Sequence, residues 1–408
     1  MKEKVSIIKQ DHYGRGIAYY QDKILFIPNA LPNEEVLVNH IKEYKKYCIG
    51  ECFNILKKSP NRVIGKCPYY LSCGGCNIMH QKYEDQLIFK SNKVKEILNK
   101  FTNLNIKINP IIPSNSLYNY RNKIVLHSTN GNLGLYKENS NNIINIKECL
   151  ISSTMINDLI KIINEKIKDK SLLQEVMIRS SSLNEVLLDI KGNISKEDVF
   201  KIEYPYLKGI ILNNNLIKGR SYIYEEINGY KFKISAPSFF QVNTKMIEVL
   251  YNEALRHLQN KEYHNALDLY CGSGTITLLL SKIASKVTGI EVIPSAIANA
   301  LDNMKINNIE NVSFICGKVE DNLDNLNNLD LIVVDPPRSG LDKNVIENIF
   351  RLKSDTLIYI SCDPVTLARD LNLLKELYDI KEITPVDMFP QTYHVECVSV
   401  LYRKSLEK

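Results

Sequence analysis

The sequence contains no apolar run near the ~20 residues that a helix needs to cross a bilayer. Its first residues, Met1–Lys4, do not lead into the apolar core of a signal peptide, and no internal repeat is visible. These absences argue against a membrane-spanning helix, a secreted protein and a repeat array. We therefore expect a cytoplasmic protein with no membrane association. Separately, we expect the protein to be a monomer.

The chain also lacks a strong excess of either charge. Its 52 Lys and Arg residues against 46 Asp and Glu residues leave a net charge of +6. Such a balance suits a polyanionic partner without demanding one. The length of 408 residues and the 44% hydrophobic content allow two or three domains of roughly 100–200 residues each, each with its own core.

The cysteines are too numerous for chance and too irregular for disulfides in a reducing compartment. The chain has ten. Six stand singly: Cys48, Cys52, Cys271, Cys316, Cys362 and Cys397. Three others form a tight group, Cys67, Cys73 and Cys76, and such a group is typical of metal binding. For a single cysteine, a buried structural role is the ordinary expectation.

The first two thirds of the chain read as two regions. Residues 1–57 show short alternating apolar runs separated by turn residues, a pattern typical of a small β-barrel. Tyrosines mixed with Lys and Arg in this region favour RNA binding, although a solvated edge would look similar. Residues 58–235 carry the cysteine group, then an apolar helical stripe over 87–101, then strand-rich segments. Two Asn-rich stretches, 139–145 and 213–215, are predicted to be exposed loops.

From residue 236 onward, strands and helices alternate. Strands are predicted over 266–270, 287–291, 312–316, 331–335, 356–361, 380–388 and 394–402, with helices over 245–258, 275–284, 295–307 and 366–377. Alternation of this length implies a mostly parallel sheet covered by helices on both faces. The fold class is therefore α/β, with a barrel before an α+β middle domain and a Rossmann-like C-terminal domain over 236–408.

Three acids mark the edge of that sheet where ligands bind. Asp268 lies in the first strand, Glu291 closes the second, and Asp335 closes the fourth. Gly272-Ser273-Gly274 supplies a tight turn, but the third glycine of a dinucleotide fingerprint is missing. Adenosylmethionine has no pyrophosphate and fits this shorter loop, whereas a nicotinamide cofactor is the competing interpretation.

Cys362 follows the strand 356–361, and Pro364 helps to end that strand. The helix that follows could lower the pKa of the thiol and make it nucleophilic. One reaction that would use such a thiol beside adenosylmethionine is methylation of uracil at carbon 5. That carbon attacks a methyl sulfonium only after a thiolate adds to carbon 6, and a base must then remove the carbon 5 proton. Glu396, with a pKa raised by burial, is the preferred base, and His394 on the same sheet face is the alternative.

Taken together, four motifs resemble the RNA uracil-C5 methyltransferase family over essentially the whole chain. They are Phe239-Phe240-Gln241-Val242-Asn243, Asp335-Pro336-Pro337-Arg338, Ser361-Cys362-Asp363-Pro364 and His394-Val395-Glu396. The resemblance implies that Cys362 is the nucleophile and Glu396 the base. It also implies that adenosylmethionine is bound by Gln241, Tyr270, Glu291 and Asp335. Asp363 departs from the family, where many members have Asn.

The cysteine group requires a fourth ligand, for which Cys149 is the candidate. Four thiolates permit structural zinc or an iron–sulfur cluster, and spacing alone does not separate them. The ribosomal-RNA members of the resembled family carry a [4Fe–4S] cluster, which this resemblance assigns to Cys67, Cys73, Cys76 and Cys149.

Residues 1–57 resemble the TRAM domain, an RNA-binding barrel, through Gly14–Ala18 and Ile27–Pro32. Because the usual bacterial transfer-RNA enzymes of the family lack both the barrel and the cluster, the resemblance favours 23S ribosomal RNA as substrate. A transfer-RNA T-loop uridine is the alternative substrate. An iron–sulfur RNA-binding protein without catalytic activity is the alternative from another functional class.

Overall fold

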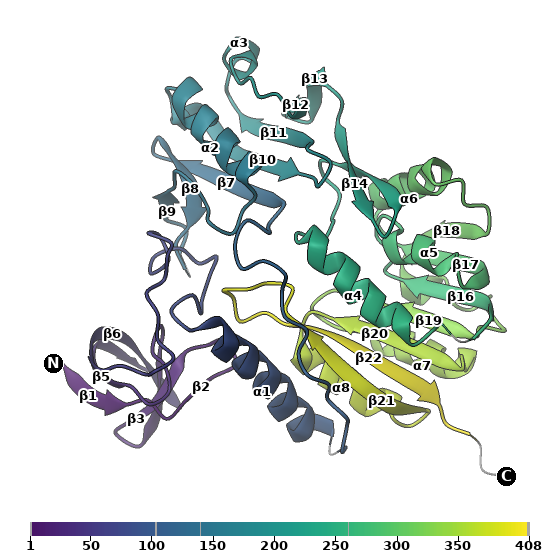
Figure 1. Cartoon of the computed structure of the whole chain (residues 1–408), viewed down its shortest axis with the longest axis horizontal. Coiled ribbons are helices and arrows are strands. Elements are labelled where there is room, and N and C mark those ends of the chain that lie inside the picture. Colours follow the sequence, from purple (N-terminus) through teal and green to yellow (C-terminus); the bar gives the residue numbers. More distant parts are fainter. Residues whose placement is uncertain (1, 103, 139, 260, 406–408) are drawn as a thin grey trace.

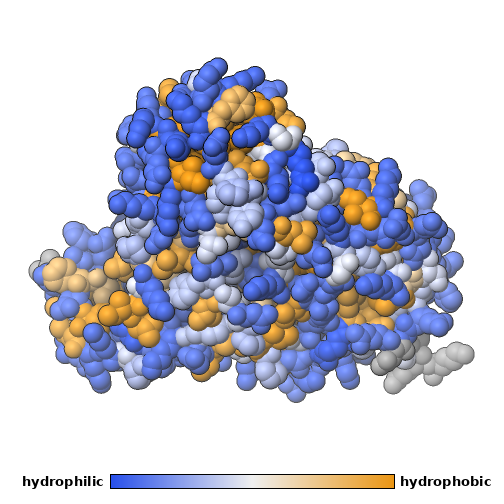
Figure 2. Space-filling model, turned by 45° about the horizontal axis from the view of Figure 1, so that its top comes forward, coloured by the Kyte–Doolittle hydropathy of each residue, from blue (hydrophilic) through white to orange (hydrophobic). Residues whose placement is uncertain are grey.

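The computed structural model describes residues 2–102, 104–138, 140–259 and 261–405. Figure 1 shows an N-terminal sheet beside the long helix α1, a middle sheet at the top of the view, and a C-terminal sheet covered by helices. Hydrophilic side chains cover most of the face seen in Figure 2, where apolar side chains form separate patches. In the part of the chain that is described, no helix is both long and apolar enough to span a membrane.

The N-terminal sheet has six strands in the order β1-β5-β6-β4-β3-β2. The strands are β1 (Glu3–Ser6), β2 (Lys9–Gln10), β3 (Gly16–Tyr20), β4 (Lys23–Ile27), β5 (Glu35–Glu43) and β6 (Tyr47–Lys57). The turn before β3 needs a glycine, because Gly14 has φ +79° and an added Cβ would lie 2.5 Å from Ile78 Cγ2. Gly14 thus brings this sheet against the cysteine-bearing segment.

The middle sheet has seven strands in the order β13-β12-β11-β10-β7-β8-β9. Its strands are β7 (Lys123–Thr129), β8 (Asn132–Tyr136), β9 (Ile143–Asn145), β10 (Leu173–Ser180), β11 (Val186–Gly192), β12 (Leu207–Leu212) and β13 (Asn215–Gly219). Helix α2 (Thr154–Lys166) packs on it, and the short helices η1 (Lys170–Leu172) and α3 (Lys196–Phe200) lie in its connections. A separate hairpin, β14 (Tyr222–Ile227) and β15 (Tyr230–Ser235), leads to the C-terminal sheet.

Both Asn-rich stretches depart in part from the predicted loops. Residues 143–145 form β9, and Asn215 begins β13. Asn213 and Asn214 do form a turn, with φ of +49° and +65°, values that asparagine tolerates better than most residues. Residue 139 lies outside the described residues.

The C-terminal sheet confirms the predicted α/β alternation. Its order is β18-β17-β16-β19-β20-β22-β21, and only the pairs of β22 with β20 and β21 are antiparallel. The strands are β16 (Tyr263–Leu269), β17 (Ala284–Glu291), β18 (Val312–Cys316), β19 (Leu331–Val334), β20 (Thr356–Ser361), β21 (Tyr378–Val386) and β22 (Glu396–Arg403). The helices are α4 (Thr244–Arg256), α5 (Thr275–Leu280), α6 (Pro294–Ile306), η2 (Val319–Asp321), α7 (Lys343–Leu352) and α8 (Pro364–Leu374).

Successive residues of each strand fill two separate cores. Ala266 packs with α4 and α5 on one face, whereas Leu267 packs with α7 and α8 on the other, as the two-residue period of a strand requires. Helix α1 (Tyr83–Thr102) also packs on the α8 face through Val94, Ile97 and Leu98. The sequence analysis placed α1 before residue 236 in the middle region, but in space α1 lies against the C-terminal sheet.

Candidate active site

A cavity of about 760 Å³ lies at the carboxyl ends of the parallel strands. It is lined by all six residues to which the family resemblance gives a catalytic or cofactor-binding role: Gln241, Tyr270, Glu291, Asp335, Cys362 and Glu396. They come from six separate segments of the chain, and the topology alone brings them to one edge. The volume is in the range of sites for a ligand of cofactor size.

The glycine loop after β16 forms one wall of this cavity. Gly272 and Gly274 have φ of +54° and +81°, and an added Cβ at Gly274 would lie 2.9 Å from the Phe314 ring. The carboxylate of Glu291 accepts hydrogen bonds from the backbone N–H of Gly272 at 3.1 Å and of Ile293 at 2.9 Å. The loop and the Glu291 carboxylate therefore hold each other in place beside the cavity.

The two other acids at this edge have different surroundings. Asp268 does not line the cavity; it is fully buried, and its Oδ2 accepts a 2.6 Å hydrogen bond from Thr277 in α5. Burial raises the pKa of Asp268 to about 7, and burial alone does the same to the pKa of Asp335. Asp268 thus braces α5 against β16, whereas Asp335 faces the ligand space.

Cys362 lies directly before α8, as predicted, but its pKa is shifted in the opposite direction. Burial first, and then the carboxylates of Glu396 and Asp335, raise the pKa of the thiol to about 12. The helix offers little compensation, because the Asp363 side chain already accepts hydrogen bonds from the first N–H groups of α8. The expectation of a lowered pKa from the helix terminus is therefore wrong.

Glu396 begins β22 and is 2% exposed. Burial, followed by repulsion from Asp335, raises its pKa to about 8, as predicted in direction. Its Oε2 has no hydrogen-bond partner among the described residues. The neighbouring His394 also lines the cavity, and burial together with the charge of Arg338 lowers its pKa to about 3. Burial therefore favours the neutral forms of both His394 and Glu396.

Sequence analysis missed an asparagine ladder on α6. The amides of Asn303 and Asn307 pair with the backbone of β15 at Lys233 and Lys231. Asn303 Nδ2 also donates to the carbonyl of Ser273, in the glycine loop, at 3.0 Å. The signal was the spacing of four residues between these asparagines, which places them on one helix face; the abundance of asparagine elsewhere obscured it.

A second cavity, of about 430 Å³, is lined by all four candidate metal ligands: Cys67, Cys73, Cys76 and Cys149. Burial is the largest cause of the raised pKa of the Cys67, Cys73 and Cys76 thiols, and nearby thiols of the group add to it. Residues 73–76 form a tight turn in which the Gly75 N–H lies 3.4 Å from Cys73 Sγ. Topology therefore unites the three clustered cysteines with Cys149 of the middle region.

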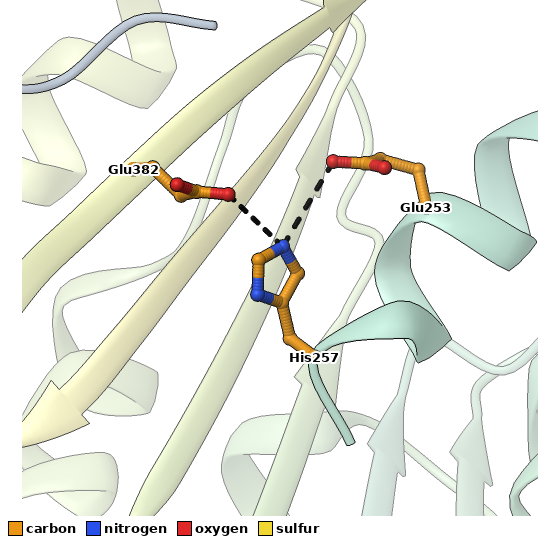
Figure 3. Close-up of side chains that lie close together, drawn as sticks. All are labelled: Glu253, His257 and Glu382. Atoms are coloured by element: carbon orange, nitrogen blue, oxygen red, sulfur yellow. Dashed lines mark ion pairs between the residues drawn. The ribbon is translucent and has the colours of Figure 1, made fainter. Parts of the chain in front are cut away.

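A third group, shown in Figure 3, joins α4 to β21 through Glu253, His257 and Glu382. Their ligand atoms lie within 4.8 Å of one another. Arg256 contacts Glu253 at 2.8 Å and Glu382 at 3.1 Å, and Lys107 contacts Glu382 at 2.6 Å. Because cationic side chains already balance both carboxylates, this group is an ion-pair network that fastens α4 to the sheet.

The fold and the sequence are similar to those of known RNA methyltransferases. The structure superposes on the tRNA (uracil-54, C5)-methyltransferase of Pyrococcus abyssi in complex with S-adenosyl-L-homocysteine, with a TM-score of 0.81 and 27% identity. The match covers 97% of this chain and 99% of that one. An uncharacterized RNA methyltransferase of Clostridium acetobutylicum is 38% identical over 96% of this chain and 94% of the relative. One from Staphylococcus aureus is 34% identical over 98% and 97%.

The fold is that of an α/β methyltransferase. Residues 195–404 match the family model described as tRNA (uracil-5-)-methyltransferase. The chain belongs to this family of RNA uracil-C5 methyltransferases, as the sequence motifs indicated.

Proposed function

We propose that the protein transfers a methyl group from adenosylmethionine to carbon 5 of a uridine in RNA, with Cys362 as nucleophile and Glu396 as base. One observation carries the proposal: a buried carboxyl group with an unpartnered oxygen shares a cavity with a thiol at the end of a parallel sheet. A binding protein would gain nothing from leaving such a group unpaired, because an unpartnered buried polar atom costs stability.

The reaction assigns each side chain one task. The Cys362 thiolate forms a bond to carbon 6 of uracil, and the electrons of the carbon 5–carbon 6 double bond move onto carbon 5 and the carbon 4 carbonyl. Carbon 5 would then take the methyl group of the adenosylmethionine sulfonium, as the bond between that methyl group and sulfur breaks and adenosylhomocysteine leaves. Glu396 removes the remaining carbon 5 proton, the double bond re-forms, and the bond to Cys362 breaks to regenerate the thiolate.

The residues around the cavity fit adenosylmethionine. The Glu291 carboxylate is held by two backbone N–H groups and is suited to accept hydrogen bonds from ribose hydroxyls. The positive φ of Gly272 and Gly274 gives the backbone the tight turn that a close ligand needs. Tyr270 and Gln241 would enclose the ligand, and Asp335 would face its positive charge.

The spacing of the sulfurs of Cys67, Cys73, Cys76 and Cys149 is an observation that favours an iron–sulfur cluster over a zinc ion. Four thiolates around one zinc, at about 2.3 Å each, would lie well under 4.8 Å from one another. Among the described residues, only Glu253, His257 and Glu382 bring three donor atoms that close, so the cysteine sulfurs are spread more widely. We propose a structural [4Fe–4S] cluster on Cys67, Cys73, Cys76 and Cys149.

The proposed organisation is an RNA-binding barrel over 1–57, a cluster-bearing middle domain over 58–235 and a catalytic domain over 236–408. Strands β1 and β2 support a barrel: they end the order of the N-terminal sheet at opposite sides, yet only Ile7 and Ile8 separate them. Arg15 lies 4.4 Å from the Phe26 ring, and Tyr44 stacks on Tyr47. Aromatic rings beside cations suit single-stranded RNA.

We propose that the enzyme works as a cytoplasmic monomer.

For the substrate we propose a uridine of 23S ribosomal RNA. A transfer-RNA uridine is the second candidate, because the Pyrococcus abyssi enzyme is a transfer-RNA methyltransferase and matches 97% of this chain. A match of that extent includes the N-terminal sheet, so the sheet does not by itself distinguish the two substrates. Methyl transfer to 23S and transfer-RNA transcripts, followed by mapping of 5-methyluridine, decides between them.

The catalytic proposal is tested with RNA that contains 5-fluorouridine, which blocks release of the covalent adduct. Wild type and Cys316→Ala, which alters an exposed cysteine outside the cavity, should form a denaturation-resistant adduct, and Cys362→Ala should not. Glu396→Gln on ordinary RNA should accumulate the adduct. Absence of both adduct and methyl transfer in wild type, on either RNA, would refute the proposal.

The cluster is tested separately by Cys67→Ser in protein purified without oxygen. Wild type should be brown and contain iron and sulfide, whereas the variant should lose the visible absorption of an iron–sulfur cluster. A colourless wild type with one zinc per chain would replace the cluster with a zinc site.

A further inference from the structure

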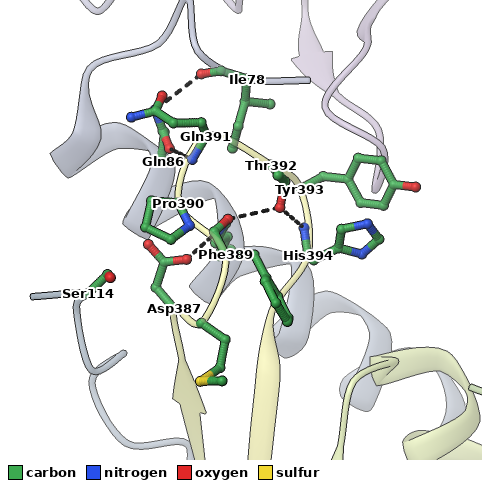
Figure 4. Close-up of polar contacts among 12 residues, drawn as sticks. Ile78, Gln86, Ser114, Asp387, Phe389, Pro390, Gln391, Thr392, Tyr393 and His394 are labelled. Atoms are coloured by element: carbon green, nitrogen blue, oxygen red, sulfur yellow. Dashed lines mark hydrogen bonds and ion pairs between the residues drawn. The ribbon is translucent and has the colours of Figure 1, made fainter. Parts of the chain in front are cut away.

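The loop between β21 and β22, residues 387–395, leads directly into Glu396 and carries His394. Figure 4 shows this loop meeting Ile78 and Gln86, which precede it by some three hundred residues in the sequence. The backbone N–H groups of Asn77 and Ile78 donate to the carbonyl of Gln391 at 3.0 and 3.1 Å. Asn77 follows Cys76 directly. Asn77 and Ile78 therefore form a two-residue strap that connects the cysteine site to the active-site loop.

The side chains of Gln86 and Gln391 tighten this connection. Gln86 Nε2 donates to Gln391 Oε1 at 3.1 Å, and Gln86 Oε1 accepts from the Gln391 backbone N–H at 3.0 Å. Both side chains are buried, at 1% and 3% exposure. Gln391 has φ +71°, a left-handed conformation that a non-glycine residue adopts when its surroundings enforce it. The loop thus takes its shape from contacts with the Asn77–Gln86 segment.

Other contacts hold the earlier part of the loop, from Lys90 in α1 and from Tyr120. Lys90 Nζ pairs with Asp387 Oδ1 at 2.5 Å and donates to the Phe389 carbonyl at 3.0 Å. Tyr120 donates to the carbonyl of Pro390 at 3.0 Å. The Gln391 contacts are the ones that reach Asn77, which directly follows Cys76.

We propose that Gln86 and Gln391 are positioning residues that couple the cysteine site to Glu396. A ligand shared by Cys67, Cys73, Cys76 and Cys149 fixes residue 76, the strap at 77–78 then fixes Gln391, and Gln391 fixes the loop that sets the direction of the Glu396 carboxyl group. Loss of a cysteine ligand should therefore loosen the base and leave the proposed nucleophile Cys362, which follows β20, in place. The role of Glu396 as base rests on the proposed function.

Hydrogen–deuterium exchange of the full-length protein tests the coupling without any activity. Gln86→Met keeps the volume of the side chain but removes its hydrogen bonds. Gln81→Met is the matched control, because Gln81 is equally buried on the same segment but bonds to Gln10 and Asp85 instead. We expect amides of peptides covering 387–396 to exchange roughly tenfold faster in Gln86→Met and at the wild-type rate in Gln81→Met.

The link to the cysteines is tested in the same peptides. Cys76→Ser, and wild-type protein stripped of its metal by a chelator, should both show the faster exchange, whichever metal the site holds. Exchange over 387–396 that stays at the wild-type rate in Gln86→Met overturns the positioning role, and an unchanged rate in both metal-deficient proteins overturns the coupling. Using two routes to remove the ligand guards against a Cys76→Ser protein that fails to fold.

A kinetic measurement then separates positioning from general damage. On RNA containing ordinary uridine, Gln86→Met should form the Cys362 adduct at the normal rate and release it roughly tenfold more slowly, since a small displacement of a reacting group is enough for such a loss. Equal slowing of both steps would contradict the proposal. If wild-type enzyme forms no adduct at all, the proposed function fails, while the exchange experiment still decides whether the coupling exists.

Discussion

The buried carboxyl group of Glu396 makes the stability of the ligand-free protein depend on pH. Its pKa is about 8 in the folded protein, against an ordinary value of 4.5. Between these pH values the folded chain keeps a proton that the unfolded chain has released. The free energy of unfolding therefore falls as the pH rises through this window, which means that the folded protein becomes less stable. Glu396→Gln, which cannot ionise, should be free of that cost.

The shift in the pKa of Glu396 sets an upper bound on the stability that its ionisation removes from the folded protein. A displacement from 4.5 to about 8 corresponds to about 4 kcal/mol at pH 8, where half of the folded carboxyl groups are already ionised, and to less than about 0.5 kcal/mol near pH 4.5. Relaxation around a charged carboxylate lowers the measured value below this bound. Wild type and Glu396→Gln should thus be about equally stable at pH 5, and the variant should be the more stable protein at pH 8.

Urea unfolding followed by far-ultraviolet circular dichroism between pH 5 and 8, without RNA or adenosylmethionine, measures this difference. Glu382→Gln is the matched control of opposite sign. Burial alone would raise the pKa of Glu382, but hydrogen bonds from Lys107 and Asn109 and nearby positive charge outweigh it and lower the pKa to about 2. The ionised form of Glu382 therefore stabilises the fold at pH values above its ordinary pKa, and Glu382→Gln should be less stable than wild type at pH 7. A gap between wild type and Glu396→Gln that is the same at pH 5 and pH 8 would refute the raised pKa of Glu396.

Three further substitutions test the supports of the site. Lys90→Met leaves a fully buried carboxylate without its cation and should cost about 3–5 kcal/mol in thermal unfolding; a loss below about 1 kcal/mol would show that the pair is solvated. Asn303→Ala should weaken adenosylhomocysteine binding measured by calorimetry, whereas Asn307→Ala, which does not reach the glycine loop, should not; equal effects would contradict this role. Gly274→Ala should weaken the same binding more than Gly229→Ala, since both glycines have positive φ but only Gly274 has no room for a Cβ.

The sequence predicted the catalytic half of the molecule well because the information there is local. Strands buried on both faces read as apolar runs, and Gly272 and Gly274 mark a turn that other residues would strain. In a parallel sheet all strand ends meet at one edge, so Glu291, Asp335 and Cys362 had to come together once the alternation was recognised.

What the sequence did not predict depends on contacts between distant segments. Helix α1 has an apolar stripe that fits any partner, and nothing local assigns it to α8. The pKa of Cys362 depends on Glu396 and Asp335, which come from other strands. Asp363 gave a local hint, since a helix whose first N–H groups are capped by a carboxylate cannot also stabilise a neighbouring thiolate.

The electrostatics of the cavity indicate the order in which the site becomes reactive. Burial raises the pKa of Cys362, and the carboxylates of Glu396 and Asp335 raise it further, while Arg338 opposes them only in part. A cationic ligand beside Asp335 would offset that negative charge and thereby lower the pKa of both the thiol and Glu396. The proposed chemistry therefore needs a group that stabilises the Cys362 thiolate, and a bound cation beside Asp335 would be such a group. The negative charge that disfavours the Cys362 thiolate in the empty site would therefore also favour the binding of a sulfonium.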